Sequence, residues 1–172
     1  MKNHSAKHFY LKKIFATTTL SVILFGCVSV NLDSGVTKKA EKIELTEPTL
    51  NFVKIKNKTV DQAWQNVKNG NTIAYLSECN SKSDPTLKTL QDENLSALTN
   101  IEIIDSKELT FNDREALLTT ANGLVDGVGI RIRLLIFKKN GCNYTVSFVG
   151  RKKFFLADEM SFSKFIEGFK AP

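Results

Sequence analysis

Few side chains in this 172-residue sequence are suited to acid–base chemistry. Carboxylates occur in three pairs, at Asp92-Glu93, at Asp113 and Glu115, and at Asp158-Glu159. Two carboxylates can hydrolyse a glycosidic bond when a cleft holds them at a set distance. Each pair lies in an expected helix start, turn or exposed face, where acids are common. The favoured interpretation is therefore solvated surface charge, with a carboxylate-based hydrolase as the alternative.

The N-terminal segment has the organisation of an export signal. Residues 1–13 are basic without an acid, and residues 14–25 are uncharged. As a helix that run reaches about 18 Å, short of the roughly 30 Å hydrocarbon core of a bilayer. Removing residues 1–26 leaves 20 basic and 18 acidic residues, a net charge of +2, and removes both histidines, His4 and His8. A nucleic-acid footprint needs clustered surplus charge, and here the surplus belongs to the N-terminal segment.

The residues Leu24-Phe25-Gly26-Cys27 resemble the lipobox of bacterial lipoprotein precursors, although Phe25 departs from the usual small or β-branched residue. The resemblance implies diacylglyceryl transfer to the Cys27 sulfur, cleavage after Gly26 and acylation of the new N-terminus. Two or three acyl chains anchor a protein stably where one is marginal. Val28, where an aspartate would imply inner-membrane retention, implies the outer membrane, with the domain in the periplasm. The alternative is an uncleaved signal anchor.

With Cys27 acylated, Cys79 and Cys142 are the remaining thiols. An even pair in an oxidising compartment predicts a disulfide, and the alternative is two reduced, buried thiols. A cysteine nucleophile would lack a histidine to act as its base. Zinc and copper sites would lack ligands, so we expect neither a metal nor a cofactor.

A basic and aromatic surface is the candidate site for binding a partner. Two of its residues lie on one expected strand and the others lie just after the next: Arg131, Arg133, Arg151, Lys152, Phe154 and Phe155. Such a patch suits anionic lipid, polysaccharide or an acidic partner. The adjacent phenylalanines cannot both point inward on a strand, so one is expected at the surface. The alternative is an ordinary charged sheet face.

The chain divides into a signal peptide at residues 1–26, a lipidated tether at 27–48 and one globular domain at 49–172. Asn69-Gly70 predicts a hairpin after the segment that contains Trp64. Asp84 and Pro85 predict the start of a helix that ends near residue 100. Its core-facing residues would be Leu87, Leu90, Ala97 and Leu98.

Four strands should follow, at residues 101–111, 116–125, 128–137 and 143–149. The turn at Asn140-Gly141 allows two registers for the last pair. A two-residue turn sets Leu134 opposite Ser147, whereas a three-residue loop sets Leu134 opposite Val146. Because the buried face normally fixes the register, we expect the three-residue loop.

A closing helix should begin at a cap, Asp158, and present an apolar face made of Phe162, Phe165, Ile166 and Phe169. Helix, antiparallel meander and helix predict an α+β sandwich in which the sheet packs with two main helices. The order of elements from Ser83 to Phe169, with Tyr144 in the last strand, resembles the PsbP-like fold of photosynthetic accessory proteins and small bacterial lipoproteins. That resemblance implies an accessory or binding role.

The sequence thus favours a non-enzymatic, outer-membrane-anchored periplasmic lipoprotein that binds an envelope protein or component. The alternatives are the carboxylate hydrolase and a small-ligand carrier with a pocket between helix and sheet. A deep cleft with two acids would favour the hydrolase, and an enclosed apolar cavity the carrier. A filled core with an exposed aromatic and basic patch would favour the accessory module.

Overall fold

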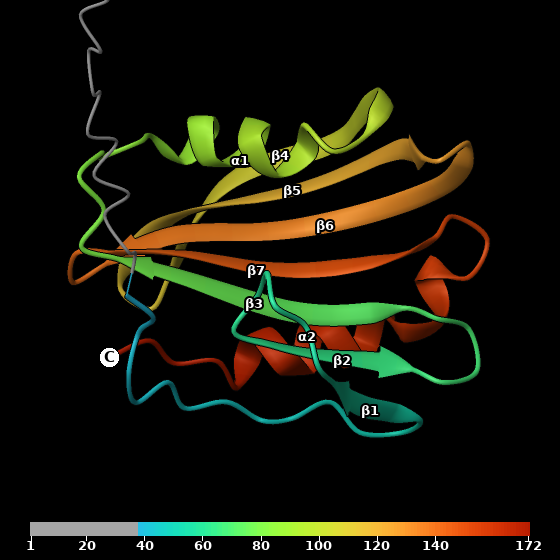
Figure 1. The fold of residues 1–172 in the computed structure, drawn as a ribbon, viewed down its shortest axis with the longest axis horizontal. Helices are drawn as coiled ribbons and strands as arrows, with labels where there is room; N and C mark the ends of the chain where they lie inside the picture. The colour runs from blue at the N-terminus through green and yellow to red at the C-terminus, as the bar shows by residue number, and fades with distance from the viewer. Residues whose placement is uncertain (1–37) are drawn as a thin grey trace, which may run out of the picture. The chain divides into compact units, whose positions relative to one another are not determined.

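The computed structural model describes residues 38–172. The expected signal peptide and the lipidation expected at Cys27 lie outside the described residues. Seven antiparallel strands form one sheet in the order β1-β2-β3-β7-β6-β5-β4 (Figure 1). The elements in chain order are β1 (Phe52–Ile55), β2 (Gln62–Asn66), β3 (Thr72–Cys79), α1 (Leu87–Leu95), β4 (Thr99–Phe111), β5 (Arg114–Val125), β6 (Val128–Lys139), β7 (Cys142–Arg151), a short 3₁₀ helix (Phe155–Asp158) and α2 (Glu159–Glu167).

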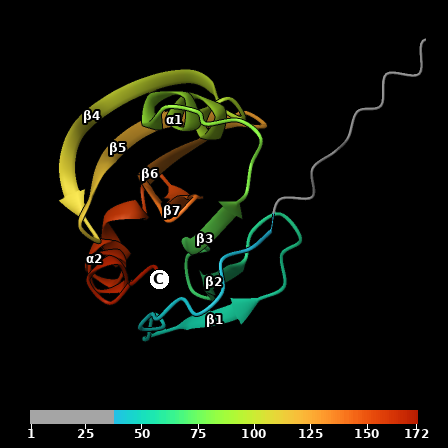
Figure 2. The same ribbon diagram turned by 90° about the vertical axis from the view of Figure 1, so that its left-hand side faces the viewer.

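The sheet separates the two helices, as Figure 2 shows. Alternation along β6 explains why both faces are covered. Leu134 and Ile136 pack with the α1 residues Leu90 and Leu95, whereas Leu135 and its neighbours pack with α2. The α2 side holds most of the aromatic residues, and the expected core positions Trp64, Phe148, Phe162, Phe165 and Phe169 are all buried. The predicted α+β sandwich with two main helices is therefore confirmed.

The expected register of the last hairpin is wrong. Lys139 pairs with Cys142 across a two-residue Asn140-Gly141 turn, which sets Leu134 opposite Ser147. Both turn residues have positive φ, 51° and 75°, as a type I′ turn requires. The expectation assumed one buried face for the pair. Because the sheet is buried on both faces here, the isoleucines of β6 and the aromatic residues of β7 lie on opposite sides.

The first helix is shorter than expected, because it begins later and ends earlier in the chain. Thr86 caps α1 by accepting a hydrogen bond from the backbone N–H of Thr89 at 3.1 Å. Asp84 instead forms an ion pair with Lys138 on β6. The helix ends at Leu95, and Ala97, expected on the core face, is exposed.

Residues 38–48, assigned to the tether from the sequence, lie against the domain. The backbones of Lys38 and Cys79 exchange hydrogen bonds of 3.2 and 2.8 Å, and Glu44 pairs with Lys170 in the same way. Ile43 and Leu45 pack against the α2 side of the core. The folded part therefore already includes Lys38, instead of beginning at residue 49. None of the helices within residues 38–172 has the length and apolar character needed to span a bilayer.

Candidate binding surface

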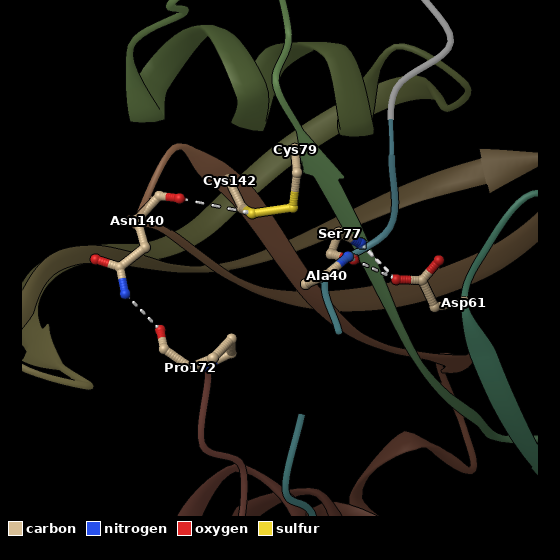
Figure 3. Close-up of a disulfide and its surroundings, with 7 residues drawn as sticks. All are labelled: Ala40, Asp61, Ser77, Cys79, Asn140, Cys142 and Pro172. Carbon is tan, nitrogen blue, oxygen red and sulfur yellow. Dashed lines mark hydrogen bonds between the residues drawn. A yellow bond between two sulfur atoms is a disulfide. The ribbon is translucent and has the colours of Figure 1, made fainter. Parts of the chain in front are cut away.

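The strands give the domain two ends. At one end Lys38 lies beside Cys79, which forms a disulfide with its register partner Cys142 (Figure 3). The predicted disulfide is thus confirmed. The other end carries the β2–β3 and β5–β6 turns and the connection from β7 to α2. Since β3 has eight residues, about 25 Å separates these ends.

The end remote from Lys38 collects exposed apolar and basic side chains. We call this group the distal surface, and its members are Leu50, Val67, Lys68, Val125, Val128, Arg151, Lys152, Lys153, Phe154, Leu156 and Met160. Leu50 and Met160 are the most exposed of the apolar members, at 79% and 72%. None of its four cations forms an ion pair with a residue in 38–172. Apolar side chains surrounded by free cations are suited to a partner with an acidic rim.

A buried carboxylate fastens this end together. Asp158 accepts hydrogen bonds from the side-chain amides of Asn66, Asn69 and Asn71 at 2.9, 2.7 and 2.8 Å. It makes no capping bond to α2, so the expected cap is corrected to a tertiary contact. The amide of Asn71 also donates to the Phe154 carbonyl at 2.9 Å. These bonds hold the start of α2 against the β2–β3 turn.

The two adjacent phenylalanines point in opposite directions, and one of them is at the surface, as expected. Phe155 is completely buried, with its ring centroid 4.4 Å from that of Phe148. Phe154 is 37% exposed, and the ammonium of Lys153 lies 4.6 Å from its ring centroid. The proposed contact at Phe155 is therefore corrected, because its ring supports the surface from below and only Phe154 belongs to the surface.

The two strand arginines lie on the α2 side, opposite the isoleucines, and differ in their remaining hydrogen-bonding capacity. Arg133 donates to Thr120 Oγ1 at 3.0 Å and forms an ion pair with Glu159 at 2.5 Å, which joins β6 to α2. Arg131 donates through Nε to Asn122 Oδ1 at 2.9 Å. Its two terminal nitrogens bind no acceptor in the described part of the chain. Arg131 thus retains donors for an anion, whereas Arg133 is structural.

The packing around Phe155 also explains how these arginines are held. The guanidinium carbons of Arg131 and Arg133 lie 5.7 and 5.8 Å from the Phe155 ring centroid, within range of a cation–π contact. Arg131 stands opposite Gly150, one residue before Arg151. Arg151 is the register partner of Ile130 and so starts from the α1 face, whereas Arg131 lies on the α2 face. The structure therefore places Arg151, Lys152 and Phe154 of the predicted site together at this end, and Arg131 on the other face of the sheet.

Several residues of the distal surface were missed from the sequence. Leu50 has a φ of +55° and is followed by Asn51 at +70°, and no local pattern predicts such a conformation for leucine. Leu156 and Met160 lie next to predicted residues, but their exposure depends on how Asp158 orients the start of α2. The repeated asparagines at 66, 69 and 71 were the signal that a polar contact would form at this turn.

A second feature is an open groove of about 770 Å³ between α1 and strands β4 to β6. It is lined by Thr86, Leu87, Lys88, Ser106, Glu108, Glu115, Leu117 and Lys138. The two lysines are already paired, with Asp92 and Asp84. Glu108 and Glu115 come from neighbouring strands and form no ion pair or hydrogen bond within residues 38–172. The groove is neither an enclosed apolar cavity nor a deep cleft.

Comparison with known proteins identifies the fold. No family model and no curated protein matches the chain. Among solved structures, LpqN, involved in cell envelope biogenesis of Mycobacterium tuberculosis, superposes with a TM-score of 0.56 and 13% identity over 76% of this chain and 83% of that one. CyanoP, the PsbP of the cyanobacterium Synechocystis, gives 0.51 and 10% over 80% and 96%. The chain has a PsbP-like fold.

A third match, a protein of Bacteroides thetaiotaomicron, gives a TM-score of 0.50 and 12% identity over 76% of this chain and 45% of that one. At these identities the PsbP-like likeness concerns the fold alone. The expected PsbP-like architecture is thus confirmed, and no functional residue is transferred by it. Within the described residues, no three His, Cys, Asp or Glu side chains are grouped to hold a metal ion.

Proposed function

We propose that this protein is a lipid-anchored periplasmic lipoprotein of the outer membrane and a non-enzymatic binding module for an envelope protein. The observation that carries the proposal is the distal surface. Its exposed apolar side chains and unpaired cations lie at one end of the domain. The chain from Cys27 joins the domain at the other end, at Lys38. An anchor at one end and a docking surface at the other would leave that surface accessible.

The chemistry of the distal surface favours a partner with acidic groups around an apolar centre. Phe154 and Arg151 are residue types that are enriched at protein interfaces. The unpaired donors of Arg131 add a site for a carboxylate. The LpqN structure gives weak support for an envelope role, because that protein is described as involved in cell envelope biogenesis.

A site-specific crosslinking experiment tests the docking surface. A photoreactive amino acid replaces Phe154 in the full-length chain, expressed in a bacterium, and a matched variant carries it at Asn57, which is exposed in the β1–β2 connection, outside the distal surface. We expect an envelope protein to be captured from position 154 and not from position 57. Adding Arg151→Glu and Lys152→Glu should reduce the yield at 154. Equal capture at both positions would contradict the proposal.

The anchor is tested separately. Cys27→Ser should abolish incorporation of labelled palmitate and leave the precursor uncleaved, because the resemblance to a lipobox places the acyl acceptor at this sulfur. The Cys79→Ser, Cys142→Ser double variant is the matched control and should retain the label. Equal labelling of the Cys27 variant and the parent would sink the lipoprotein interpretation.

The groove beside α1 supports a second candidate, binding of a small ligand. Its volume lies in the range of ligand sites, and Glu108 and Glu115 are free to accept hydrogen bonds. A ligand with amino or hydroxyl groups fits this lining best. Saturable binding that is weakened by Glu108→Gln and Glu115→Gln would support it. Turnover of an envelope glycan that either change abolishes would instead establish the hydrolase.

A further inference from the structure

Two short stretches of the domain carry more positive charge than the domain has in total. Residues 38–42 and 54–61 contain six lysines and two acids, a net charge of +4, whereas residues 38–172 contain 20 basic and 17 acidic residues, a net charge of +3. We call this group the N-terminal lysine surface, and its members are Lys38, Lys39, Lys42, Lys54, Lys56 and Lys58. The rest of the described chain is slightly acidic.

The fold places these two stretches side by side around one buried carboxylate. Asp61, at the end of the β1–β2 connection, accepts hydrogen bonds from the backbone N–H and the hydroxyl of Ser77 at 2.9 and 2.5 Å (Figure 3). Lys39 forms an ion pair with the other oxygen of Asp61 at 3.1 Å. The hydroxyl of Ser77 in turn accepts the backbone N–H of Ala40 at 2.8 Å. The contacts of Asp61 therefore hold the N-terminal segment against the connection.

The lysines of this surface are exposed and mostly free. Lys58 lines two adjoining hollows, one of which it shares with Lys39 and the other with Lys54 and Lys56. Lys54 is occupied by Gln62 and Glu47. Lys38, Lys56 and Lys58 are exposed and form no ion pair within residues 38–172. Besides Asp61, the acids of this region are Glu47, which pairs with Lys54, Glu78, which lines the hollow shared by Lys39 and Lys58, and Glu41, which lies between Lys39 and Lys42 in the sequence.

The length of chain before Lys38 keeps this surface near the membrane. Cys27 precedes Lys38 by eleven residues, which span at most about 40 Å when fully extended. Lys38, Lys39 and Lys42 lie where that segment joins the domain, and the contact of Lys39 with Asp61 brings the connection that carries Lys58 beside them. An anchored chain can therefore bring these lysines to the bilayer. The distal surface lies at the end of β3 remote from Lys38; Lys54 on β1 is level with Ile73, and Lys56 and Lys58 follow it in the connection that leads back toward Ser77.

We propose that the N-terminal lysine surface rests on anionic phospholipid of the membrane that carries the anchor, which orients the distal surface away from the bilayer. This rests on the proposed function, because it presumes attachment at Cys27. Lysines close to an anionic bilayer are attracted to its negative surface potential, and the attraction falls off within a Debye length. A short tether makes the contact an intramolecular event at high effective concentration.

Lysine footprinting on vesicles tests this contact. The chain from Cys27 to Pro172, with its disulfide closed, has one free thiol, which is coupled to a maleimide lipid in vesicles of phosphatidylcholine, with or without phosphatidylglycerol. Acetylation of each lysine is then measured by mass spectrometry. We expect Lys38, Lys56 and Lys58 to be protected several-fold on the anionic vesicles alone, and the protection to disappear at high salt. Lys68, Lys152 and Lys153 should react equally on both.

A pair of charge-reversal variants provides the matched comparison. Lys56→Glu with Lys58→Glu should abolish the protection of Lys38, since each basic residue near such a surface strengthens association by about fivefold. Lys152→Glu with Lys153→Glu, at the other end, should leave the protection unchanged. Both pairs are exposed, so circular dichroism should show an intact fold.

Three outcomes would overturn the inference. They are protection of the distal lysines instead, which would make the distal surface a membrane contact; equal protection on neutral vesicles; and no protection on anionic ones. Chemical coupling at Cys27 makes the result independent of whether the cell acylates that residue. A failure here is therefore distinguishable from a failure of the palmitate or crosslinking experiments.

Discussion

Asp158 and Asn71, 87 positions apart in the chain, are joined by a 2.8 Å hydrogen bond between the carboxylate and the side-chain amide. The contact is close on the other side as well. A Cβ atom on Gly150 would lie 2.0 Å from Asn71 Oδ1, so only glycine allows the amide to reach Asp158. This pair fixes the position of the connection from β7 to α2, and hence of the exposed side chains of the distal surface that it carries.

Removing this carboxylate should cost more than an ordinary surface change. Asp158→Ala leaves the amides of Asn66, Asn69 and Asn71 without their shared acceptor, which should lower the free energy of unfolding by about 2–4 kcal/mol. Urea denaturation measures the loss. Glu93→Ala, an exposed acid on α1, is the control and should change stability by less than about 0.5 kcal/mol. Equal losses of stability in the two variants would show that the hydrogen bonds of Asp158 do not stabilise the fold.

Phe154 and Phe155 should separate binding from stability. Phe155→Ala empties a fully buried site and should cost about 3–5 kcal/mol. Phe154→Ala removes a ring that is 37% exposed, so it should cost much less and instead weaken capture of the partner. Chemical denaturation measures the first effect, and the crosslinking yield from a photoreactive residue placed at Leu156 measures the second. A similar loss of stability in both variants would contradict the opposite orientations.

The disulfide closes a long loop, since Cys79 and Cys142 are 63 positions apart in the chain. In the chain-entropy model a loop of this length contributes about 4 kcal/mol by restricting the unfolded chain. Cys142→Ala should therefore lower the melting temperature by roughly 15 °C. Reducing the parent protein should give a similar decrease, and non-reducing mass spectrometry should show the crosslink. An unchanged melting temperature after reduction would argue against this role.

The α2-side core was largely predictable, because helical spacing places Phe162, Phe165 and Phe169 on one face, and all three are buried. The β6–β7 register was not. The alternation of β6 and β7 is unambiguous, but the sequence does not say whether one or both faces of the sheet are covered. When both faces are covered, each strand can bury either set of residues, and the turn chemistry of Asn140-Gly141 decides the register instead.

The candidate surface was predicted only in part for a similar reason. Basic residues after a strand indicated Arg151 and Lys152. Which side chains join them depends on tertiary contacts, since Asp158 orients Leu156 and Met160 through asparagines about ninety residues away. Adjacent phenylalanines required that one be exposed, but not which. Long-range polar contacts of this kind leave no period in the sequence.

Two buried tyrosines should make the fold sensitive to alkaline pH. Burial raises the pKa of Tyr75 and of Tyr144, and the negative charge of Asp61 adds to both effects. The folded state therefore favours the neutral phenols. The stabilisation that they contribute is fully present below the unfolded pKa of about 10 and is lost as pH rises through the folded pKa. Unfolding midpoints in urea should fall above about pH 10.

Tyr144→Phe isolates this effect from the deprotonation of lysines in the same range. The Tyr144 hydroxyl is buried and has no hydrogen-bond partner within residues 38–172, so replacing it should cost almost nothing at neutral pH. Above pH 10 the variant should lose stability less steeply than the parent, because it has no phenol to ionise. Parallel curves for the two proteins would show that Tyr144 is not the group responsible. The alkaline loss of stability should then be reduced in Tyr75→Phe instead.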